Sequence, residues 1–380
     1  MAIPVALPPE AQLLAGTANP LVPPAEVDRV PIALLVDLSS GAVLYAKEPD
    51  RRFLPASITK VMTIYTAFEM LSHGQIKVEQ PMRMSEQAFR DWHNVGSTMF
   101  LDRSAQPKVS DLLLGIANVS ANDGCVVLAE GAAGSVANWV ALMNAEARRM
   151  GMADSHFGTP NGWMDEGETY VTAHDLATLA KVMITEHPEE YRHYIGHETL
   201  TWNGITQRNH DPILGKLEGA DGIKTGFTNQ AGYGFLGSAE RNGRRLVMVI
   251  AGADRPADRA RAAKALMNWG FDAFASKPLF PSGAKVGAAA VQGGAVRSVP
   301  LVTPAGFAAS IPRDGGKPVS LRIVYDGPLQ APVAKGSIVA ALEIQIGNDK
   351  PHQVPLIAGA DVRKADRMER LRNGLLGLIS

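Results

Sequence analysis

The hydrophobic period changes several times along the chain, and these changes limit the possible folds more than any other feature of the sequence. An alternating strand pair is expected over residues 32–46, helical periodicity dominates residues 57–186, and alternation returns from Gly222. Alternation with period 2 indicates strands, whereas a period of 3.6 indicates helices. This order predicts an α+β domain over residues 31–276, in which an antiparallel sheet packs with helices.

The later strands of this domain have the clearest signals. Residues 223–228, 232–240 and 245–251 are predicted to form three antiparallel strands, and Asn242-Gly243 joins the last two. An Asn-Gly pair between alternating segments is a strong hairpin signal because both residues tolerate positive φ. Helices are predicted at residues 57–71, 110–118, 122–132, 135–150, 172–186 and 257–274.

Two more segments differ in composition from this domain. Residues 1–30 are rich in proline and alanine without clear periodicity, and we expect them to form an extended lead-in. Beyond Lys277 the chain consists of short alternating segments separated by glycine and proline turns. This pattern predicts a small all-β domain over residues 277–360.

The final segment, residues 361–380, has the pattern of an amphipathic helix. Its apolar residues recur at spacings of three and four, which places them on one face. Five basic and three acidic side chains lie between them, and the net charge of +2 suits anionic headgroups. The segment therefore predicts a helix that holds the protein on a membrane surface, and a helix docked on the β domain is the alternative. The apolar residues are Val362, Ala365, Met368, Leu371, Leu375, Leu378 and Ile379.

Composition excludes several classes of protein. Lysine plus arginine number 37 and aspartate plus glutamate 38, so the net charge of −1 argues against a nucleic-acid partner. No apolar run approaches the ~18 residues of a membrane-spanning helix. Cys125 is the single cysteine, which excludes an internal disulfide and a cysteine-based metal cluster. The histidine spacings do not suggest zinc, and no basic residue precedes Arg29, so we expect no complete signal peptide in this sequence.

A candidate nucleophile stands at the predicted start of a helix. In Ser57-Ile58-Thr59-Lys60 the lysine lies one turn beyond the serine, on the same face. A lysine with a lowered pKa can accept the proton of the serine hydroxyl. This spacing arises by chance about once or twice in a chain of this length. A second copy, Ser282-Gly283-Ala284-Lys285, falls in a predicted turn, and we assign it a structural role.

Two other short motifs offer polar groups to a cleft. Ser120-Ala121-Asn122 falls between two predicted helices, where a hydroxyl and an amide can face the same space; helix capping is the alternative. Lys224-Thr225-Gly226 lies in a predicted strand, and glycine inside a strand often marks the close approach of a ligand. The alternative for this motif is an edge strand with an ordinary solvated lysine.

The three motifs S-x-x-K, S-x-N and K-T-G occur here in the order that marks penicillin-binding proteins and class A β-lactamases. From about residue 30 to its C-terminus, the chain resembles the bacterial D-alanyl-D-alanine carboxypeptidases of low-molecular-mass penicillin-binding type. The all-β second domain and the amphipathic tail favour this family over the β-lactamases. The resemblance also includes Leu54-Pro55-Ala56-Ser57 and residues 118–123, 201–205 and 221–228.

The resemblance implies a serine peptidase that removes the terminal D-alanine from peptidoglycan pentapeptides and is acylated by β-lactam antibiotics. Ser57 would attack the carbonyl between the two D-alanines, Lys60 would be the general base, and Ser120 would relay a proton to the leaving amine. The family requires no metal or organic cofactor. The resemblance further implies an exported enzyme, peripheral on the periplasmic face of the inner membrane.

The resemblance also implies a set of substrate-binding residues. Asn122 would hold the substrate amide and Thr225 the terminal carboxylate, while Lys224 would keep the site positive and lower the pKa of the lysine base. Gly226 would let substrate approach the strand. The backbone N–H of Phe227 would form an oxyanion hole together with that of the nucleophile.

Two positions depart from the pattern of the family. His210 occupies the place of an arginine that helps to bind the substrate carboxylate, and we expect His210 to contribute to this recognition although neutral imidazole binds carboxylates less well. Phe227 stands where a histidine is common. The loop of residues 163–170 resembles the Ω-like loop of the family, and we expect Asp165 or Glu166 to pair with Arg259; solvated surface charges are the alternative.

Two other functions remain as alternatives. A serine β-lactamase needs a dedicated deacylating carboxylate, and the expected loop has no clear Glu-x-x-x-Asn element. A non-catalytic wall-binding protein of the same fold is the other alternative, but the intact serines and lysines of all three motifs argue against it.

Overall fold

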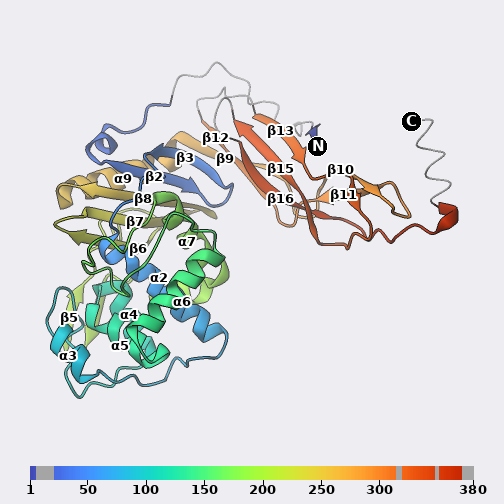
Figure 1. Cartoon of the computed structure of the whole chain (residues 1–380). Coiled ribbons are helices and arrows are strands. Elements are labelled where there is room, and N and C mark those ends of the chain that lie inside the picture. Colours follow the sequence, from blue (N-terminus) through green and yellow to red (C-terminus); the bar gives the residue numbers. More distant parts are fainter. Residues whose placement is uncertain (6–20, 314–318, 347–350, 370–380) are drawn as a thin grey trace. The chain divides into compact units, whose positions relative to one another are not determined.

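The structure is a computed structural model that describes residues 1–5, 21–313, 319–346 and 351–369. It contains two compact units (Figure 1). The α+β unit comprises Pro23–Leu38 and Val43–Gly270. The β unit comprises Met1–Val22, Ser39–Ala42 and Phe271–Ser380.

The α+β unit is built on a five-stranded sheet with the strand order β3–β2–β8–β7–β6. Leu34 lies opposite Val249 in antiparallel register, so strands far apart in the sequence are neighbours. The hairpin between β7 and β8 turns at Asn242 and Gly243, which both have positive φ, as the Asn-Gly pair predicts. The strands are β2 (Ile32–Asp37), β3 (Ala42–Lys47), β6 (Ala220–Thr228), β7 (Gly232–Arg241) and β8 (Arg244–Ala253).

Helices pack on both faces of this sheet, and Figure 1 shows α2, α4, α5 and α6 gathered on one side of it. Leu34 belongs to the core on the side of these helices. Leu35 points to the opposite face, where a Cβ at Gly270 of α9 would lie 2.5 Å from its side chain. The helices are η1 (Ala25–Arg29), η2 (Ala56–Thr59), α2 (Lys60–Ser72), α3 (Glu86–Trp92), α4 (Val109–Val119), α5 (Asn122–Ala133), α6 (Val136–Arg149), α7 (Ala173–Glu186), α8 (Pro188–Tyr194) and α9 (Pro256–Ala273), with a small hairpin of β4 (Thr199–Trp202) and β5 (Ile205–Arg208).

Helix α2 is the central helix of the α+β unit. Ten of its 13 residues are buried, including Lys60 and Tyr65. A helix that is buried around most of its circumference lies within a core rather than on a surface. The first turn of α2 therefore places polar groups inside the protein.

The β unit contains a seven-stranded sheet with the order β1–β13–β15–β16–β11–β10–β14, and a separate pair of β12 and β9. Its core is a second hydrophobic cluster that includes Leu301, Leu342 and Ile344. The prediction of an α+β domain followed by an all-β domain is confirmed. The strands are β1 (Ala2–Val5), β9 (Phe274–Phe280), β10 (Lys285–Gln292), β11 (Ser298–Val302), β12 (Phe307–Pro312), β13 (Val319–Val324), β14 (Leu329–Gln330), β15 (Ile338–Ile346) and β16 (His352–Ala358).

The N-terminal segment contains a strand that the sequence did not reveal. Ala2–Val5 form β1, which pairs with β13, within the residues expected to be an extended lead-in. Four residues are too few to show a period, so this pairing depends on the partner strand.

The start of the C-terminal segment differs from the predicted helix of residues 361–380. Val362 exchanges two backbone hydrogen bonds with Val333, and Val362 and Ala365 are buried at 3% and 5% exposure. These residues are extended because the β unit covers their side chains. A helical turn begins at residue 367, where Asp366 and Glu369 form reciprocal hydrogen bonds of the capping-box type. The rest of the predicted helix, residues 370–380, lies outside the described residues.

Among the described residues, no single helix has the length and apolar composition needed to cross a bilayer. Helices α5 and α6 meet that criterion only as a pair, and the pair is bent by 89°.

Candidate active site

Ser57 and Lys60 meet where the short helix η2 continues into α2. The Lys60 Nζ donates a hydrogen bond to Ser57 Oγ over 2.8 Å. Ala56, directly before the serine, has a φ of 48°, which an L-residue other than glycine rarely adopts. Backbone strain of this kind collects at functional sites because the surrounding structure must maintain it. The geometry therefore places a serine and a lysine in direct contact, as the S-x-x-K spacing predicts.

The Lys60 amine is completely buried and has three hydrogen-bond acceptors. Besides Ser57 Oγ, it donates to Asn122 Oδ1 over 2.8 Å and to the carbonyl oxygen of Asn161 over 2.7 Å. Burial disfavours the charged amine and lowers the pKa of Lys60 to about 8. A substantial fraction of the lysine can thus be neutral near physiological pH, as a general base requires.

The S-x-N motif forms the break between helices α4 and α5. Ser120 ends α4 in a left-handed conformation with φ of 63°, and α5 begins at Asn122. No side-chain capping bond forms at the start of α5, which argues against the capping alternative. Instead the Asn122 side chain accepts from Lys60 and donates to the carbonyl oxygen of Val95. Asn122 therefore connects the lysine to the segment at Val95.

The K-T-G motif lies on β6, the edge strand of the sheet. A Cβ at Gly226 would lie 2.4 Å from the carbonyl oxygen of Pro55 and 3.2 Å from the Ile58 nitrogen. Only glycine lets the strand approach residues 55–59 this closely. We call these residues, which contain the expected nucleophile Ser57, the nucleophile segment. Lys224 is 5% exposed and donates to the carbonyl oxygen of Thr225, which excludes the alternative of a solvated surface lysine.

The two buried lysines lie close enough for their charges to interact. Burial, followed by the charge of Lys60, lowers the pKa of Lys224 to about 7. Burial is the main cause of the lowered pKa of Lys60. Two like charges disfavour each other, so a charged Lys224 favours the neutral form of Lys60. The expected effect of Lys224 on the pKa of Lys60 stays a prediction.

The loop that follows Asn161 packs directly on the nucleophile segment. A Cβ at Gly162, which has a φ of 73°, would lie 1.9 Å from the carbonyl oxygen of Ala56 and 2.7 Å from Thr59 Oγ1. Gly162 thus fixes the position of the neighbouring Asn161 carbonyl beneath Lys60. Asn161 could not be predicted from the sequence, because any residue type supplies a backbone carbonyl and no motif marks it.

Arg259 on α9 does not form the ion pair with Asp165 that was expected from the sequence. The Asp165 side chain accepts hydrogen bonds from Thr169, not from Arg259 as expected. Arg259 is 9% exposed, and its Nη2 donates to the carbonyl oxygen of His210 over 3.5 Å. Among the described residues its Nε has no hydrogen-bond partner, so this buried cation retains a donor for an anion.

His210 and Phe227, the remaining residues predicted at the site, lie near Arg259. Burial, followed by the charges of Lys224 and Arg259, lowers the pKa of His210, so its imidazole is neutral at pH 7. Phe227 is 46% exposed and stacks on Tyr233 with ring centres 4.1 Å apart. The Arg259 guanidinium lies 5.7 Å from the centre of the Tyr233 ring. These residues form one side of the site around the K-T-G strand.

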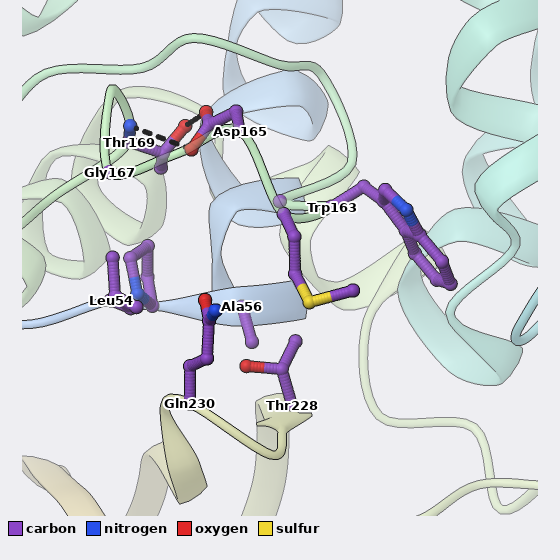
Figure 2. Close-up of a pocket in the computed structure, with 11 residues that line it drawn as sticks. Leu54, Ala56, Trp163, Asp165, Gly167, Thr169, Thr228 and Gln230 are labelled. Atoms are coloured by element: carbon purple, nitrogen blue, oxygen red, sulfur yellow. Dashed lines mark hydrogen bonds between the residues drawn. The ribbon is translucent and has the colours of Figure 1, made fainter.

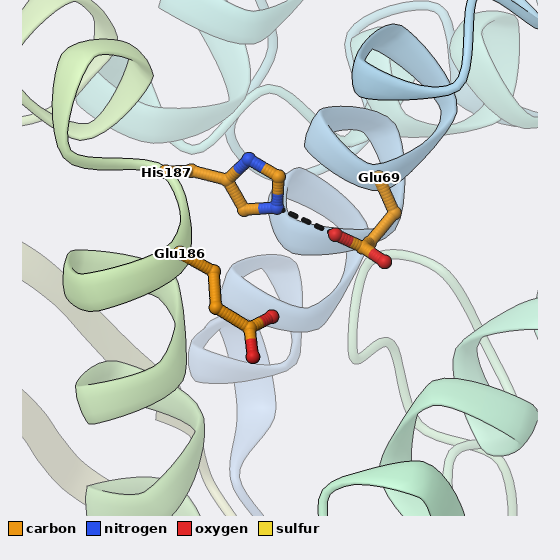
Figure 3. Close-up of side chains that lie close together, drawn as sticks. All are labelled: Glu69, Glu186 and His187. Carbon is orange, nitrogen blue, oxygen red and sulfur yellow. Dashed lines mark hydrogen bonds and ion pairs between the residues drawn. The ribbon is translucent and has the colours of Figure 1, made fainter. Parts of the chain in front are cut away.

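A separate polar cluster lies further along α2 (Figure 3). His187 Nε2 is 2.7 Å from Glu69 Oε1, and Glu186 lies beside both residues. Arg149 forms ion pairs with Glu186 at 3.2 Å and with Glu69 at 3.6 Å. The guanidinium supplies the positive charge that the two carboxylates require, so we assign this cluster a structural role. It joins α2 to α6 and to the end of α7.

The family models and the known proteins that resemble this chain agree with one another. Residues 24–255 match the family described as D-alanyl-D-alanine carboxypeptidase, and residues 274–364 match the C-terminal domain of penicillin-binding protein 5. The D-alanyl-D-alanine carboxypeptidase DacA of Haemophilus influenzae is 35% identical over 316 residues, which cover 82% of this chain and 80% of that protein. The solved structure of penicillin binding protein 5 from Haemophilus influenzae has a TM-score of 0.77 at 33% identity and covers 92% of this chain and 100% of that chain.

A more distant solved structure contains an antibiotic. Penicillin-binding protein D2 from Listeria monocytogenes, in its ampicillin-bound form, has a TM-score of 0.58 at 27% identity and covers 64% of this chain and 98% of that chain. The fold and these matches together define a serine peptidase of the penicillin-binding class. The chain belongs to the D-alanyl-D-alanine carboxypeptidase family, which confirms the family and the activity predicted from its three motifs.

The pKa of Lys60 predicts how acylation depends on pH. The rate of acylation by benzylpenicillin should rise as the pH approaches about 8 and level off above it, because only neutral Lys60 can accept the proton of Ser57. Stopped-flow or quenched mass spectrometry between pH 6 and 10 measures this rate. Lys60→Arg should not react at any of these pH values, since its guanidinium keeps its proton. A rate that is independent of pH from 6 to 9 would assign the base to another group.

Proposed function

We propose that this protein releases the terminal D-alanine from peptidoglycan peptides that end in D-Ala-D-Ala, with Ser57 as the covalent nucleophile and Lys60 as its base. The observation that carries this proposal is the 2.8 Å hydrogen bond between Ser57 Oγ and the buried Lys60 amine. A neutral amine at this distance can accept the hydroxyl proton while the oxygen attacks a carbonyl carbon.

The acylation step then follows from the positions of the other residues. Ser57 Oγ forms a bond to the carbonyl carbon between the two D-alanines, and the developing oxyanion meets the backbone N–H groups of Ser57 and Phe227. The C–N bond breaks as Ser120 relays the proton that Lys60 accepted from Ser57 to the amine of the leaving D-alanine. Water hydrolyses the resulting ester and restores the serine. Asn122, whose side chain lies beside Lys60, binds the amide of the acyl group.

The substrate carboxylate sets the charges of the two lysines in this proposal. An anion beside Thr225 and Lys224 favours the charged form of Lys224 and raises its pKa. A charged Lys224 then disfavours a second charge on Lys60, so Lys60 loses its proton instead. Substrate binding thereby favours the neutral base that acylation requires, which is the effect expected of Lys224 from the sequence.

Arg259 is the strongest candidate for an additional carboxylate contact, with His210 beside it. The buried guanidinium of Arg259 has an unused Nε donor among the described residues. It lies close enough to lower the pKa of both Lys224 and His210. His210 contributes as a neutral hydrogen-bond donor, because its lowered pKa leaves it uncharged at pH 7. In this proposal Arg259 supplies the positive charge and His210 a neutral hydrogen-bond donor. The site can then bind the carboxylate without the arginine that the family has where this chain has His210.

We further propose that the protein works outside the cytoplasmic membrane, at its periplasmic face, where peptidoglycan is found. β-Lactam antibiotics that resemble D-Ala-D-Ala act as acylating inhibitors. The capping box at residues 366–369 marks the start of a helical turn, and the basic and apolar composition of the following segment supports contact with anionic lipid.

The nucleophile can be tested by mass spectrometry after incubation with benzylpenicillin. We expect one adduct, on a peptide that contains Ser57, and Ser57→Ala should remove it together with D-Ala release. Ser282→Ala is the matched control, because it changes the serine of the second S-x-x-K spacing and should leave both reactions intact. An adduct that persists in Ser57→Ala contradicts the assignment. Slow turnover of the antibiotic without D-Ala release would favour the β-lactamase alternative.

The carboxylate contact can be tested with a pair of arginines on one helix. Arg259→Gln should lower kcat/KM for D-Ala-D-Ala peptides by about tenfold or more, because a hydrogen bond between charged groups is lost from a buried site. Arg261→Gln removes a side chain that is 51% exposed and paired with Asp258, so it should change kcat/KM little. Equal effects of the two substitutions would exclude Arg259 from substrate binding.

Membrane contact can be tested with vesicles and a truncated chain. The full chain should sediment with anionic liposomes, and a chain that ends at Glu369 should not, while it keeps D-Ala release. Truncation at this position preserves the buried Val362 and Ala365 of the β unit. Equal sedimentation of both chains would place the membrane contact outside the C-terminal segment.

A further inference from the structure

Asp211 is a buried carboxylate that the reaction proposed above does not use. It follows His210 in the segment between β5 and β6, and it is 7% exposed. Its Oδ1 accepts hydrogen bonds from the backbone N–H groups of Ile213 over 2.8 Å and Leu214 over 2.9 Å. Its Oδ2 is buried and has no hydrogen-bond partner among the described residues. A buried carboxylate oxygen without a donor is costly, so a positive charge nearby must compensate it.

Asp165, a carboxylate in the loop after Asn161, shows the contrast. The backbone N–H and the hydroxyl of Thr169 donate to its two oxygens, as the dashed lines in Figure 2 show. Its own loop therefore supplies a donor to each oxygen. Among the described residues, no such donor reaches Asp211 Oδ2. The compensation for Asp211 must come from another part of the α+β unit.

Arg259 on α9 supplies this compensating charge. Its Nη2 donates to the carbonyl oxygen of His210, the residue directly before Asp211, over 3.5 Å. Burial raises the pKa of Asp211, and its two backbone hydrogen bonds and the charge of Arg259 oppose this rise. Burial lowers the pKa of Arg259, and the charge of Asp211 opposes this fall. Each of the two buried groups therefore stabilises the charged form of the other.

The two charges attract each other without using the donor that a ligand needs. Among the described residues, neither Asp211 Oδ2 nor Arg259 Nε has a hydrogen-bond partner, so no hydrogen bond joins these two atoms. A carboxylate in direct contact would occupy N–H groups of the guanidinium. At a longer distance the carboxylate still attracts the guanidinium, because a buried site screens charges less than water does. The Nε donor then remains for an anionic ligand.

The position of the Asp211 carboxylate is itself fixed by the segment around it. Besides the two hydrogen bonds at Oδ1, the backbone N–H of Asp211 donates to Asn209 Oδ1 over 3.0 Å. The Asn209 side chain in turn donates to the carbonyl oxygen of His197 over 2.9 Å. An arginine side chain has many rotamers, and a fixed negative charge favours those that bring the guanidinium toward it. Asp211 thereby limits the directions in which Arg259 can present its unused donor.

We propose that Asp211 is a positioning residue for substrate binding, which holds the charged guanidinium of Arg259 in the orientation that receives the terminal carboxylate of the peptide. The inference rests on the proposed function, because Arg259 is the additional carboxylate contact proposed there. Asp211 acts through Arg259 in this assignment. It does not contact the substrate and takes no part in bond making.

The test is a double-mutant cycle in which D-Ala release from acetylated Lys-D-Ala-D-Ala is measured. Asp211→Asn removes the charge and keeps an amide oxygen that accepts from Ile213 and Leu214. In the wild-type background this substitution should raise KM about three- to tenfold with a smaller change in kcat. In the Arg259→Gln background it should change KM by less than about twofold, because the residue through which it acts is absent.

Two further variants separate the charge of Asp211 from the structure of its segment. Asp254→Asn is the matched control, because it makes the same change of charge at an exposed residue just before α9, and it should leave KM unchanged. His210→Arg should restore the KM of Asp211→Asn to within about twofold of the wild-type value, since it adds a second guanidinium that does not depend on Asp211. A displaced segment would not recover in this way. If Asp211→Asn does not fold, Asp211→Ser replaces it, because a serine hydroxyl can also accept from the N–H groups of a turn.

The outcomes distinguish this inference from the proposed function. Equal rises of KM in both backgrounds would show that Asp211 acts independently of Arg259 and would overturn the inference. A lower KM of Asp211→Asn would also overturn it, because the carboxylate would then repel the substrate more than it positions Arg259. Loss of folding in both Asp211→Asn and Asp211→Ser would assign Asp211 a structural role instead. Absence of D-Ala release by the wild-type protein would overturn the proposed function itself.

Discussion

The burial of one amine, Lys60 Nζ, determines how closely the surrounding segments of the active site must approach one another. A buried cation costs several kcal/mol unless hydrogen bonds replace its water. Here the three acceptors come from three segments: η2, the start of α5 and the loop at Asn161. Each segment must therefore lie within hydrogen-bond distance of one atom. The glycines at 162 and 226 make this possible, because any side chain at either position would push the backbone away from the nucleophile segment.

The helix that carries Lys60 is itself fixed along its length. Its first turn is held by the hydrogen bonds of the lysine, and further along the helix Glu69 contacts His187 and Arg149. Apolar contacts of the buried residues between these points complete its attachment to the core. A nucleophile at the start of such a helix keeps its position without substrate, which reduces the reorganisation needed in the transition state.

Motif order and hydrophobic period allowed much of this arrangement to be predicted from the sequence. Ser57, Lys60, Asn122 and Lys224 could be placed together because each belongs to a short motif whose side chains have a defined chemistry. The burial of Arg259 beside His210 could not be predicted, since a single arginine in an amphipathic helix has no pattern that distinguishes this position. The extended conformation of Val362 also could not be predicted, because its apolar spacing suits a helix equally well and only the β unit decides between the two.

The pairing of β1 with β13 has a consequence for the order of folding. Ile3 and Ile323 are register partners, and the whole α+β unit lies between them in the chain. β1 precedes β13 in the chain and cannot pair until β13 is available. Its contacts have very high contact order, and the loop to be closed is long. The α+β unit can complete its own sheet without β13, since both β2 and β8 come before β13 in the chain, so β1 should join the β unit late.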